Sequence, residues 1–328
     1  MRLPAPSYRA LFFLSFVLAV VTVLSTVVYA RRVDAAAKRA NEELNDLNLL
    51  SISAYHHRDK EFTYTVDNYG FLYQGTTGNL IDDSVLMYGT WEKDILFFLD
   101  DYARATGGKD TAFVDVGANT GIYSLFMSTR VKQVHAIEPF PPILKRLHEN
   151  VRINKFANVT VHEVGYGARE EVLPFFAPED VNQGTGTFRA DGTKVAATLK
   201  IVPGDAHLRS VATAPVGVIK IDVEGFEEAA LKGLRGTLDK HRPLVMLEVS
   251  TTNHNGTIAS FDQLKALFPA GYEIFIFVPC ERSRLNGHYE LQEFAPRAAN
   301  FFATDMHQNL VLVPGEHAPK MPRRNWPK

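Results

Sequence analysis

A regular alternation of short apolar segments and helical segments is the feature that most constrains how this chain can fold. Stretches with the length and composition of strands are Thr111–Val116, Gln133–Ile137, Asn158–Val164, Val216–Ile221, Pro243–Val249, Tyr272–Val278 and Asn309–Val313. Segments of helical composition lie between them: Ile122–Thr129, Pro142–Asn154, Phe226–Leu238 and Phe261–Phe268. Strands that alternate with helices indicate β-α-β units. The sequence therefore predicts an α/β fold with a seven-stranded, mostly parallel sheet and helices on both faces.

The composition is that of an ordinary globular protein and excludes several classes. Of 328 residues, 46% are hydrophobic and 22% are charged, and the formal net charge is −2. That balance argues against a surface built for nucleic acid, so no nucleic-acid partner is expected. The only cysteine, Cys280, rules out a disulfide within the chain and a cysteine-based zinc site. The paired carboxylates Asp222 and Glu224 could hold a divalent metal, but no further ligand cluster is evident, so we predict no metal site.

A segment near the N-terminus, Ala10–Ala30, differs from the rest of the chain because it contains no charged residue. As a helix it would measure roughly 30 Å, enough to cross the hydrocarbon core of a bilayer. We expect a retained transmembrane helix. A cleaved signal peptide stays open as the alternative, because Arg2 and Arg9 precede the run and Val28–Ala30 resembles a cleavage site.

Basic residues around this run indicate a topology. Two basic residues precede the run, and four basic residues follow it: Arg31, Arg32, Lys38 and Arg39. The positive-inside rule then predicts a single-pass membrane protein whose main domain is cytosolic, with a luminal, Golgi or exported domain as the alternative. The expected organisation is a tail (1–9), a membrane anchor (10–30), a stalk (31–60) and a globular domain (61–328).

The globular domain opens with two elements that have clear patterns. Glu61–Gln74 alternates and carries β-branched and aromatic residues around Asn68–Gly70, which is typical of a β-hairpin. Trp91–Arg104 has an amphipathic pattern and ends before Gly107 and Gly108, which predicts a helix.

The turn after the first strand of the alternating region is rich in small residues. Its sequence, VDVGANTG, contains Asp115, Gly117, Asn119 and Gly121. Glycine lets the backbone turn sharply and approach a ligand, and the N-terminus of the next helix offers free N–H groups. The second strand ends at Glu138, whose carboxylate can accept both hydroxyl protons of a ribose. Together these features predict a nucleoside-binding site at the carboxyl ends of the strands.

The spacing of the glycines narrows the choice of ligand. A dinucleotide-binding turn has the pattern G-x-G-x-x-G, whose second glycine lies against the pyrophosphate. Asn119 occupies that position here. The turn therefore favours S-adenosylmethionine, which has a ribose and an amino-acid tail but no phosphate. A NAD-dependent oxidoreductase is the weaker alternative.

Several segments carry a resemblance to a known family: FVDVGANTGIYSL, AIEPFP, VIKIDVEGFEEAALKG and the LEV strand. They look like the corresponding segments of the FkbM-type S-adenosylmethionine-dependent methyltransferases, and the resemblance covers a motif core at residues 88–314. It implies a Rossmann-like class I methyltransferase fold and S-adenosyl-L-methionine as the cofactor. Residues 1–60 match nothing in that family.

The resemblance also implies roles for single cofactor-binding residues. The loop around the methionine part of the cofactor would consist of Asp115, Gly117, Asn119 and Gly121. Glu138 would hold the ribose, and the segment from Glu163 to Tyr166 would border the adenine. A small polar hairpin at Asn182–Phe188 would overhang the site.

Asp222 and Glu224 are the candidate catalytic bases, and the resemblance places them opposite the transferred methyl group. They lie two apart on an extended segment, so their side chains point to one side, and neighbouring carboxylates raise each other's pKa. One of them could then take the proton of an acceptor hydroxyl. A helix-capping role for Glu224 stays open. His254 could assist from the loop after the fifth strand, or be only solvated.

The expected activity is O-methylation of a hydroxyl on a saccharide, a glycolipid or another small molecule. A module that binds the cofactor without transferring the methyl group is the alternative. Acceptor choice would reside in loops such as Asn182–Phe188, Thr251–Ser260 and Cys280–Asn300.

Overall fold

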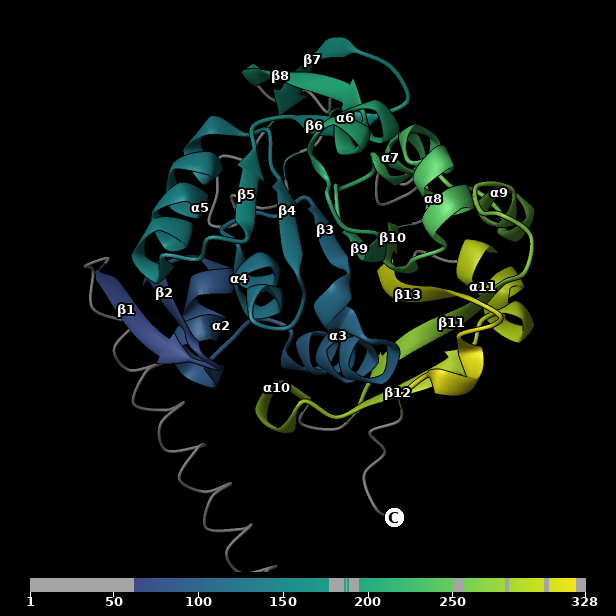
Figure 1. Ribbon diagram of the computed structural model, residues 1–328, viewed down its shortest axis with the longest axis horizontal. Helices are drawn as coiled ribbons and strands as arrows, with labels where there is room; N and C mark the ends of the chain where they lie inside the picture. The colour runs from purple at the N-terminus through teal and green to yellow at the C-terminus, as the bar shows by residue number, and fades with distance from the viewer. Residues whose placement is uncertain are drawn as a thin grey trace, which may run out of the picture. The chain divides into compact units, whose positions relative to one another are not determined.

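The computed structural model describes residues 62–176, 186, 188, 195–250, 257–280, 283–303 and 307–322. The chain divides into two units, Met1–Lys60 and Glu61–Lys328, and all described residues belong to the second. That unit is an α/β structure in which helices lie on both faces of a central sheet (Figure 1).

The central sheet has eight strands and is mixed. Five strands pair in parallel, in the order β5 (Val159–His162), β4 (Gln133–Ile137), β3 (Ala112–Val116), β9 (Val216–Ile221) and β10 (Leu244–Ser250). The remaining strands continue the sheet beyond β10 with antiparallel pairings: β13 (His307–Pro314), β11 (Tyr272–Pro279) and β12 (Tyr289–Glu293). The strand order reverses between β3 and β9, and α/β sheets bind ligands at such a point.

The expectation of a seven-stranded, mostly parallel sheet is corrected in two respects. Each predicted strand is present near its expected bounds, but β12 adds an edge strand and the C-terminal part of the sheet is antiparallel. The connection from Pro279 to Tyr289 is too short for the crossover that a parallel pair needs. In addition, β13 inserts between β10 and β11 and runs against both.

Helices cover the two faces of the sheet and bury two apolar cores. One face carries α2 (Leu80–Tyr88), α3 (Lys93–Thr106) and α4 (Ile122–Ser128), with α5 (Pro141–Asn154) at the β4 and β5 edge. The other face carries α6 (Gly204–Val211), α7 (Glu227–Gly233), α8 (Arg235–His241), α9 (Phe261–Ala266) and α11 (Ala298–Ala303). The one-turn helix α10 (Ser283–Asn286) packs against α3.

Two smaller sheets flank the central one. The hairpin of β1 (Thr63–Asn68) and β2 (Phe71–Thr76) turns at Tyr69 and Gly70, which confirms the predicted hairpin. The second is a three-stranded sheet at the top of Figure 1, in the order β6 (Gly165–Gly167), β8 (Val195–Pro203) and β7 (Glu171–Phe176). Of the polar hairpin predicted at Asn182–Phe188, only Gly186 and Phe188 are among the described residues.

The helix predicted at Phe226–Leu238 is in fact two helices, α7 and α8, which meet at Leu234. A close backbone approach explains why the segment carries a glycine there. A Cβ atom on Gly233 would lie 1.9 Å from the carbonyl oxygen of Gly167 in β6. Only glycine therefore lets the end of α7 pass so close to the small sheet.

The expectation of a membrane-spanning helix is corrected as well. Among the described residues, no helix is both long and apolar enough to cross a bilayer. The helices α3 and α5 have 14 residues each, and a span needs about 20 apolar ones. The run Ala10–Ala30 lies outside the described residues. The expectation of a single-pass membrane protein with a cytosolic domain depended on that run and has no support in the structure.

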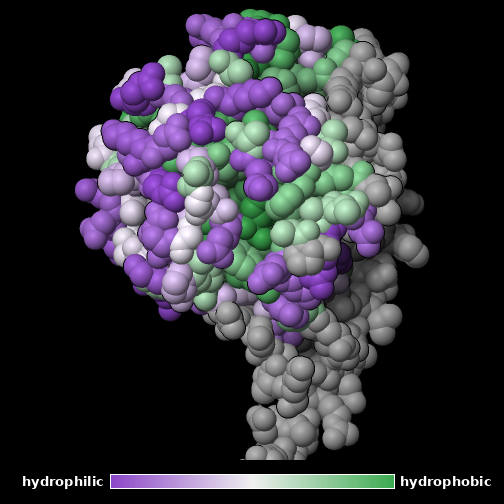
Figure 2. All heavy atoms as spheres, turned by 90° about the vertical axis from the view of Figure 1, so that its right-hand side faces the viewer, coloured by the Kyte–Doolittle hydropathy of each residue, from purple (hydrophilic) through white to green (hydrophobic). Residues whose placement is uncertain are grey.

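The face that carries α9 and α11 mixes polar and apolar side chains (Figure 2). Hydrophilic side chains cover much of one half of the view, and apolar ones gather beside them. The inward sides of the covering helices are apolar, with Leu238 and Leu264 fully buried. This division is the one expected of amphipathic helices that cover a sheet.

Candidate active site

The turn between β3 and α4 lies where the strand order reverses. Gly117 follows β3 directly and has φ +86°, a conformation that side chains rarely adopt. A Cβ atom there would lie 1.8 Å from the carbonyl oxygen of Asp222. The N–H groups of Gly117 and Ala118 both donate to the carbonyl of Ile137, at 3.0 Å. Glycine thus lets the turn fit tightly between the ends of β4 and β9.

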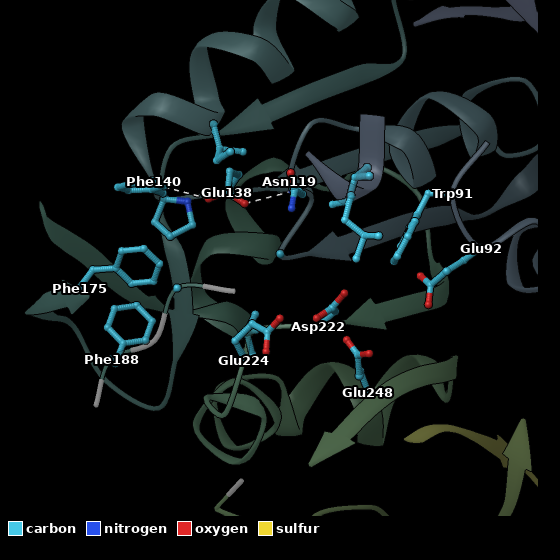
Figure 3. A pocket seen from close by; sticks show the side chains of 17 residues that line it. Trp91, Glu92, Asn119, Glu138, Phe140, Phe175, Phe188, Asp222, Glu224 and Glu248 are labelled. Carbon is cyan, nitrogen blue, oxygen red and sulfur yellow. Dashed lines mark hydrogen bonds between the residues drawn. The ribbon is translucent and has the colours of Figure 1, made fainter. Parts of the chain in front are cut away.

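A cavity of about 330 Å³ opens at this turn. Its two ends differ in character (Figure 3). Aromatic side chains gather at one end: Phe140, Phe175 and Phe188. Acidic side chains lie toward the other end, where Trp91 also lies: Glu92, Asp222, Glu224 and Glu248. Glu138 and Asn119 lie along the wall between the two ends.

Glu138, at the end of β4, is held by two backbone groups. Its Oε2 accepts a hydrogen bond from the Asn119 N–H (3.1 Å), and its Oε1 accepts one from the Phe140 N–H (2.9 Å). Burial raises the pKa of Glu138 to about 7. Each carboxylate oxygen can accept a second hydrogen bond. Glu138 can therefore bind the hydroxyl groups of a ligand without giving up its backbone partners.

Asp115 lies beneath the turn, fully buried in β3. Its Oδ2 accepts a hydrogen bond from the Ser124 hydroxyl (2.7 Å). Within the part of the chain that the structure describes, its Oδ1 has no hydrogen-bond partner. Burial raises the pKa of Asp115 to about 6. Because an unpartnered buried acceptor is costly, this oxygen is suited to a donor from a ligand or a water molecule.

Charged groups meet at the ends of β9 and β10. The buried Lys220 donates from Nζ to Asp222 Oδ2 (2.8 Å) and lies 4.4 Å from the centre of the Tyr123 ring. The Glu248 carboxyl forms a hydrogen bond with Asp222, which requires that one of the two carries a proton. Burial and the Asp222 charge raise the pKa of Glu248 well above its usual range. We therefore assign the shared proton to Glu248, which leaves Asp222 as the anion paired with Lys220.

Glu92 completes this group from the N-terminus of α3. The Tyr123 hydroxyl donates to Glu92 Oε2 (2.6 Å), and burial raises the pKa of Glu92. Burial alone would lower the pKa of Lys220, but Asp222 and Glu92 more than offset that effect and raise it. Lys220 is therefore a permanent positive charge among carboxyl groups.

Glu224 lies on the turn that follows β9. Burial, and then the charges of Asp222 and Glu227, raise the pKa of Glu224 to about 8. The N-cap of α7 is Phe226, and Glu227 accepts the hydrogen bond from the Gly225 N–H (2.8 Å). Glu224 therefore does not cap α7, and its carboxyl is largely protonated at neutral pH.

Three cavity residues have strained backbones: Glu92 (φ 42°), Asn119 (φ 49°) and Glu224 (φ 49°). Only six non-glycine residues in the described ranges have positive φ. Such conformations cost about 1–3 kcal/mol each and cluster at functional sites. Their concentration around one cavity supports its assignment as the active site.

The aromatic end of the cavity joins segments that are distant in sequence. Phe140 follows β4 and Phe175 lies in β7, with ring centroids 5.0 Å apart. The ring centroid of Phe188 lies 5.3 Å from that of Phe175 and 4.6 Å from that of Phe226. Clustered rings of this kind offer an apolar surface to another flat ring.

The structure brings half of the predicted site residues to the cavity wall: Gly117, Asn119, Glu138, Asp222 and Glu224. Asp115 and Gly121 support the turn without lining the cavity; Gly121 is the N-cap of α4, with φ +96°. His254 lies outside the described residues.

Two predicted residues lie away from the cavity. The exposed Glu163 has its Oε1 2.9 Å from Nε2 of His148. The buried Tyr166 has its hydroxyl 2.9 Å from Nδ1 of His207. Neither side chain lines the cavity, so the prediction that they border the adenine has no geometric support.

Sequence reasoning missed other residues of the acidic end: Trp91, Glu92, Lys220 and Glu248. A signal for two of them was present, because Lys220 and Glu248 are charged residues inside otherwise apolar strands. A buried charge needs a partner, and its position in a strand points to a polar site nearby.

The described residues form a methyltransferase-like α/β fold with a mixed sheet, in which a buried carboxylate lies beside the glycine turn at the strand-order reversal. The family model described as "Methyltransferase FkbM domain" matches residues 115–274. This match covers just under half of the chain and confirms the resemblance to the FkbM-type methyltransferases noted in the sequence.

Two curated relatives are similar to part of the chain. The hexuronic acid methyltransferase AglP of Haloferax volcanii is 32% identical over 148 residues, covering 45% of this chain. Methyltransferase 1 of Beauveria bassiana is 25% identical over 165 residues, covering 42% of this chain. The chain spans only 58% and 62% of the lengths of these relatives.

Two solved structures are similar to the chain at low identity. The methyltransferase FkbM from Methylobacillus flagellatus has 19% identity and a TM-score of 0.41, covering 62% of this chain and 44% of that one. A putative methyltransferase from Streptococcus mutans in complex with SAH has 11% identity and a TM-score of 0.39, covering 67% and 96%.

Proposed function

We propose that this protein is an S-adenosylmethionine-dependent methyltransferase that acts on a hydroxyl group of a saccharide. The observation that carries the proposal is the position of Glu138, a buried carboxylate beside the glycine turn at the strand-order reversal. A ribose needs such an acceptor for its two hydroxyl groups. The match of residues 115–274 to the FkbM methyltransferase model supports methyl transfer as the reaction class.

The residues around the cavity fit this cofactor. Glu138 can accept from the ribose, and the Oδ1 of Asp115, buried beneath the turn, can accept from a cationic amino group through a bridging water molecule. The rings of Phe140 and Phe175 offer the apolar surface that an adenine needs. We therefore assign the adenine to these two rings in place of Glu163 and Tyr166. When bound, the cofactor supplies an activated methyl group, so the protein mainly has to orient the reactants.

The acidic end of the cavity is then left for the acceptor. A hydroxyl group must lose its proton as it is methylated, and Asp222 is the candidate that takes it. Asp222 is the ionised member of the pair with Glu248, and Lys220 fixes its Oδ2. Glu224, protonated near neutral pH, can instead donate a hydrogen bond to the acceptor.

A saccharide is the acceptor class that the comparisons favour. The relative with 32% identity is described as a hexuronic acid methyltransferase. Carboxyl groups beside an aromatic ring suit a ligand with many hydroxyl groups, because each carboxylate oxygen accepts hydrogen bonds. Trp91 and Glu92 provide this combination at the acceptor end.

The test begins with thermal unfolding of the purified chain in the presence of S-adenosylmethionine or NAD. We expect only S-adenosylmethionine to raise the melting temperature, and Glu138→Gln to reduce that rise. Glu163→Gln is the matched control, because Glu163 follows the neighbouring strand but lies outside the cavity.

Transfer is then measured with methyl-labelled cofactor and a panel of saccharides. Recovery of the labelled methyl group in a saccharide supports the proposed methyltransferase activity. Cofactor binding without transfer to any saccharide would favour a binding module, and stabilisation by NAD alone would refute the cofactor assignment.

A further inference from the structure

A second cavity, of about 360 Å³, shares Trp91 and Glu92 with the first. Its walls come from the end of α2, the loop that leads into α3, the region of α10, and β13. Trp91 and Glu92 lie at the acidic end of the first cavity, opposite the phenylalanine rings (Figure 3). These two side chains therefore lie between the proposed cofactor site and the second cavity.

A row of polar side chains along the sheet links the two cavities. Ile221 of β9 pairs with Leu247 of β10, so Asp222 and Glu248 follow as the next neighbours. Glu248 lies directly opposite Asn309 of the antiparallel strand β13, and directly opposed residues project from the same face. Glu248 lines the first cavity and Asn309 lines the second.

The second cavity also has polar groups that are not used elsewhere in the described structure. The Asn309 amide and the Tyr88 hydroxyl form no hydrogen bond with another described residue. An amide group both donates and accepts, and so does a phenol hydroxyl. The indole of Trp91 provides a flat apolar wall beside them.

We propose that the second cavity binds the saccharide acceptor, with a sugar ring against Trp91 and its hydroxyl groups on Asn309 and Tyr88. This assignment rests on the proposed function, since it gives that reaction its acceptor site. The sugar then reaches past Glu92 to Asp222, the proposed proton acceptor at the acidic end of the first cavity, while the cofactor occupies the rest of that cavity. The combination of a flat ring with neutral donors and acceptors fits a polyhydroxyl ligand better than an apolar one.

Trp91 provides a direct signal for the experiment. The chain has two tryptophans, Trp91 and Trp326, so Trp326→Phe leaves Trp91 as the only indole reporter. Its fluorescence is titrated first with S-adenosylmethionine. It is then titrated with methyl glycosides of hexoses, deoxyhexoses and hexuronic acids, at saturating S-adenosylhomocysteine so that no turnover occurs.

We expect at least one methyl glycoside to change the Trp91 signal at millimolar concentration. Asn309→Ala and Tyr88→Phe should each raise its dissociation constant about fivefold, the worth of one hydrogen bond. Both variants should leave the cofactor titration unchanged. Gln292→Ala, in β12 and outside both cavities, is the control and should change neither titration.

Two results would overturn the assignment: no response to any of the glycosides, or a response that Asn309→Ala and Tyr88→Phe leave intact. Failure of the proposed function gives a different pattern. In that case S-adenosylmethionine does not change the Trp91 fluorescence of the parent chain. A fluorescence response to a glycoside that is weakened by both Asn309→Ala and Tyr88→Phe would still support the second site.

Discussion

The two ends of the first cavity are built in different ways. The aromatic end depends on ring contacts between Phe140, Phe175 and Phe188, which come from separate parts of the chain. The acidic end depends on a charge network in which Lys220 pairs with Asp222 and Glu248 carries the shared proton. Ring contacts give affinity, whereas a fixed charge with a protonated neighbour serves proton transfer. From this difference we propose that the cofactor binds at the aromatic end and that the chemistry takes place at the acidic end.

The largest expected effect is that of Asp222→Asn at the acidic end. An amide cannot take the acceptor's proton, so kcat should fall by a factor of about 10²–10⁴. The cofactor dissociation constant should stay within about twofold, because Asp222 is not assigned to cofactor binding. Kinetics with methyl-labelled cofactor and calorimetry on the same preparation check both values. Asp239→Asn, on the surface of α8, is the control. Equal losses in cofactor binding and in kcat would show that the two ends are not separate.

The next largest effect is expected from Glu138→Gln, between the two ends. Hydrogen bonds to a charged acceptor are worth about 1.5–3 kcal/mol, so the cofactor should bind roughly 10- to 150-fold more weakly. Calorimetry measures this, with Glu163→Gln as the matched control. In this variant the side-chain amide oxygen can still accept one of the two hydrogen bonds from the backbone N–H groups of Asn119 and Phe140. We therefore expect the fold to persist. An unchanged dissociation constant would remove Glu138 from the ribose site.

The carboxyl groups of the cavity should make the free protein less stable as the pH rises. The pKa of Glu224 is raised to about 8 in the folded chain, so the folded state holds a proton that the unfolded state has already lost. This stabilisation is lost as the pH rises through the folded pKa. Between about pH 7 and 9 we expect the free energy of unfolding to fall by about 1.4 kcal/mol from this one group.

Urea unfolding of the parent and of Glu224→Gln over that range measures the effect, and the variant should show a smaller decline. His135 and His162 act with the opposite sign, because burial lowers the pKa of each to about 4. Their effect lies below about pH 6.5, outside this window. Identical pH profiles for the two proteins would exclude Glu224 as a protonated carboxyl.

The smallest effect is expected at the aromatic end. Phe175→Ala removes one of the two rings proposed to contact the adenine and should weaken cofactor binding by about 0.5–1.5 kcal/mol. Because the acidic end is untouched, kcat at saturating cofactor should not change. Val172→Ala, in the same strand but 66% exposed, is the control. A fall in kcat with unchanged affinity would reverse the roles of the two ends.

The positions of the parallel strands could be predicted from the sequence, whereas the extra edge strand and the antiparallel direction of the C-terminal strands could not. Short apolar runs such as Val216–Ile221 appear with the predicted bounds because buried parallel strands are apolar throughout. The edge strand β12 (Tyr289–Glu293) was missed because its sequence, YELQE, is mostly polar. The reversal of β13 depends on contacts distant in sequence, which no local pattern encodes.

The same division holds for the site. Asn119, Glu138 and Asp222 could be predicted because they follow strands whose ends meet at the strand-order reversal. Phe175 and Glu92 could not, because the small sheet and the start of α3 reach the cavity only through tertiary packing. The role of Glu163 and Tyr166 was implied by the family resemblance, and in the structure their side chains face His148 and His207 and do not line the cavity.

The most direct test of the division between the two ends is a crystal structure of the chain with S-adenosylhomocysteine bound. We predict that the adenine lies against Phe140 and Phe175, that the ribose hydroxyl groups donate to Glu138, and that the sulfur faces Asp222 and Glu248. Density for the adenine at the acidic end, or anywhere outside this cavity, would contradict the account.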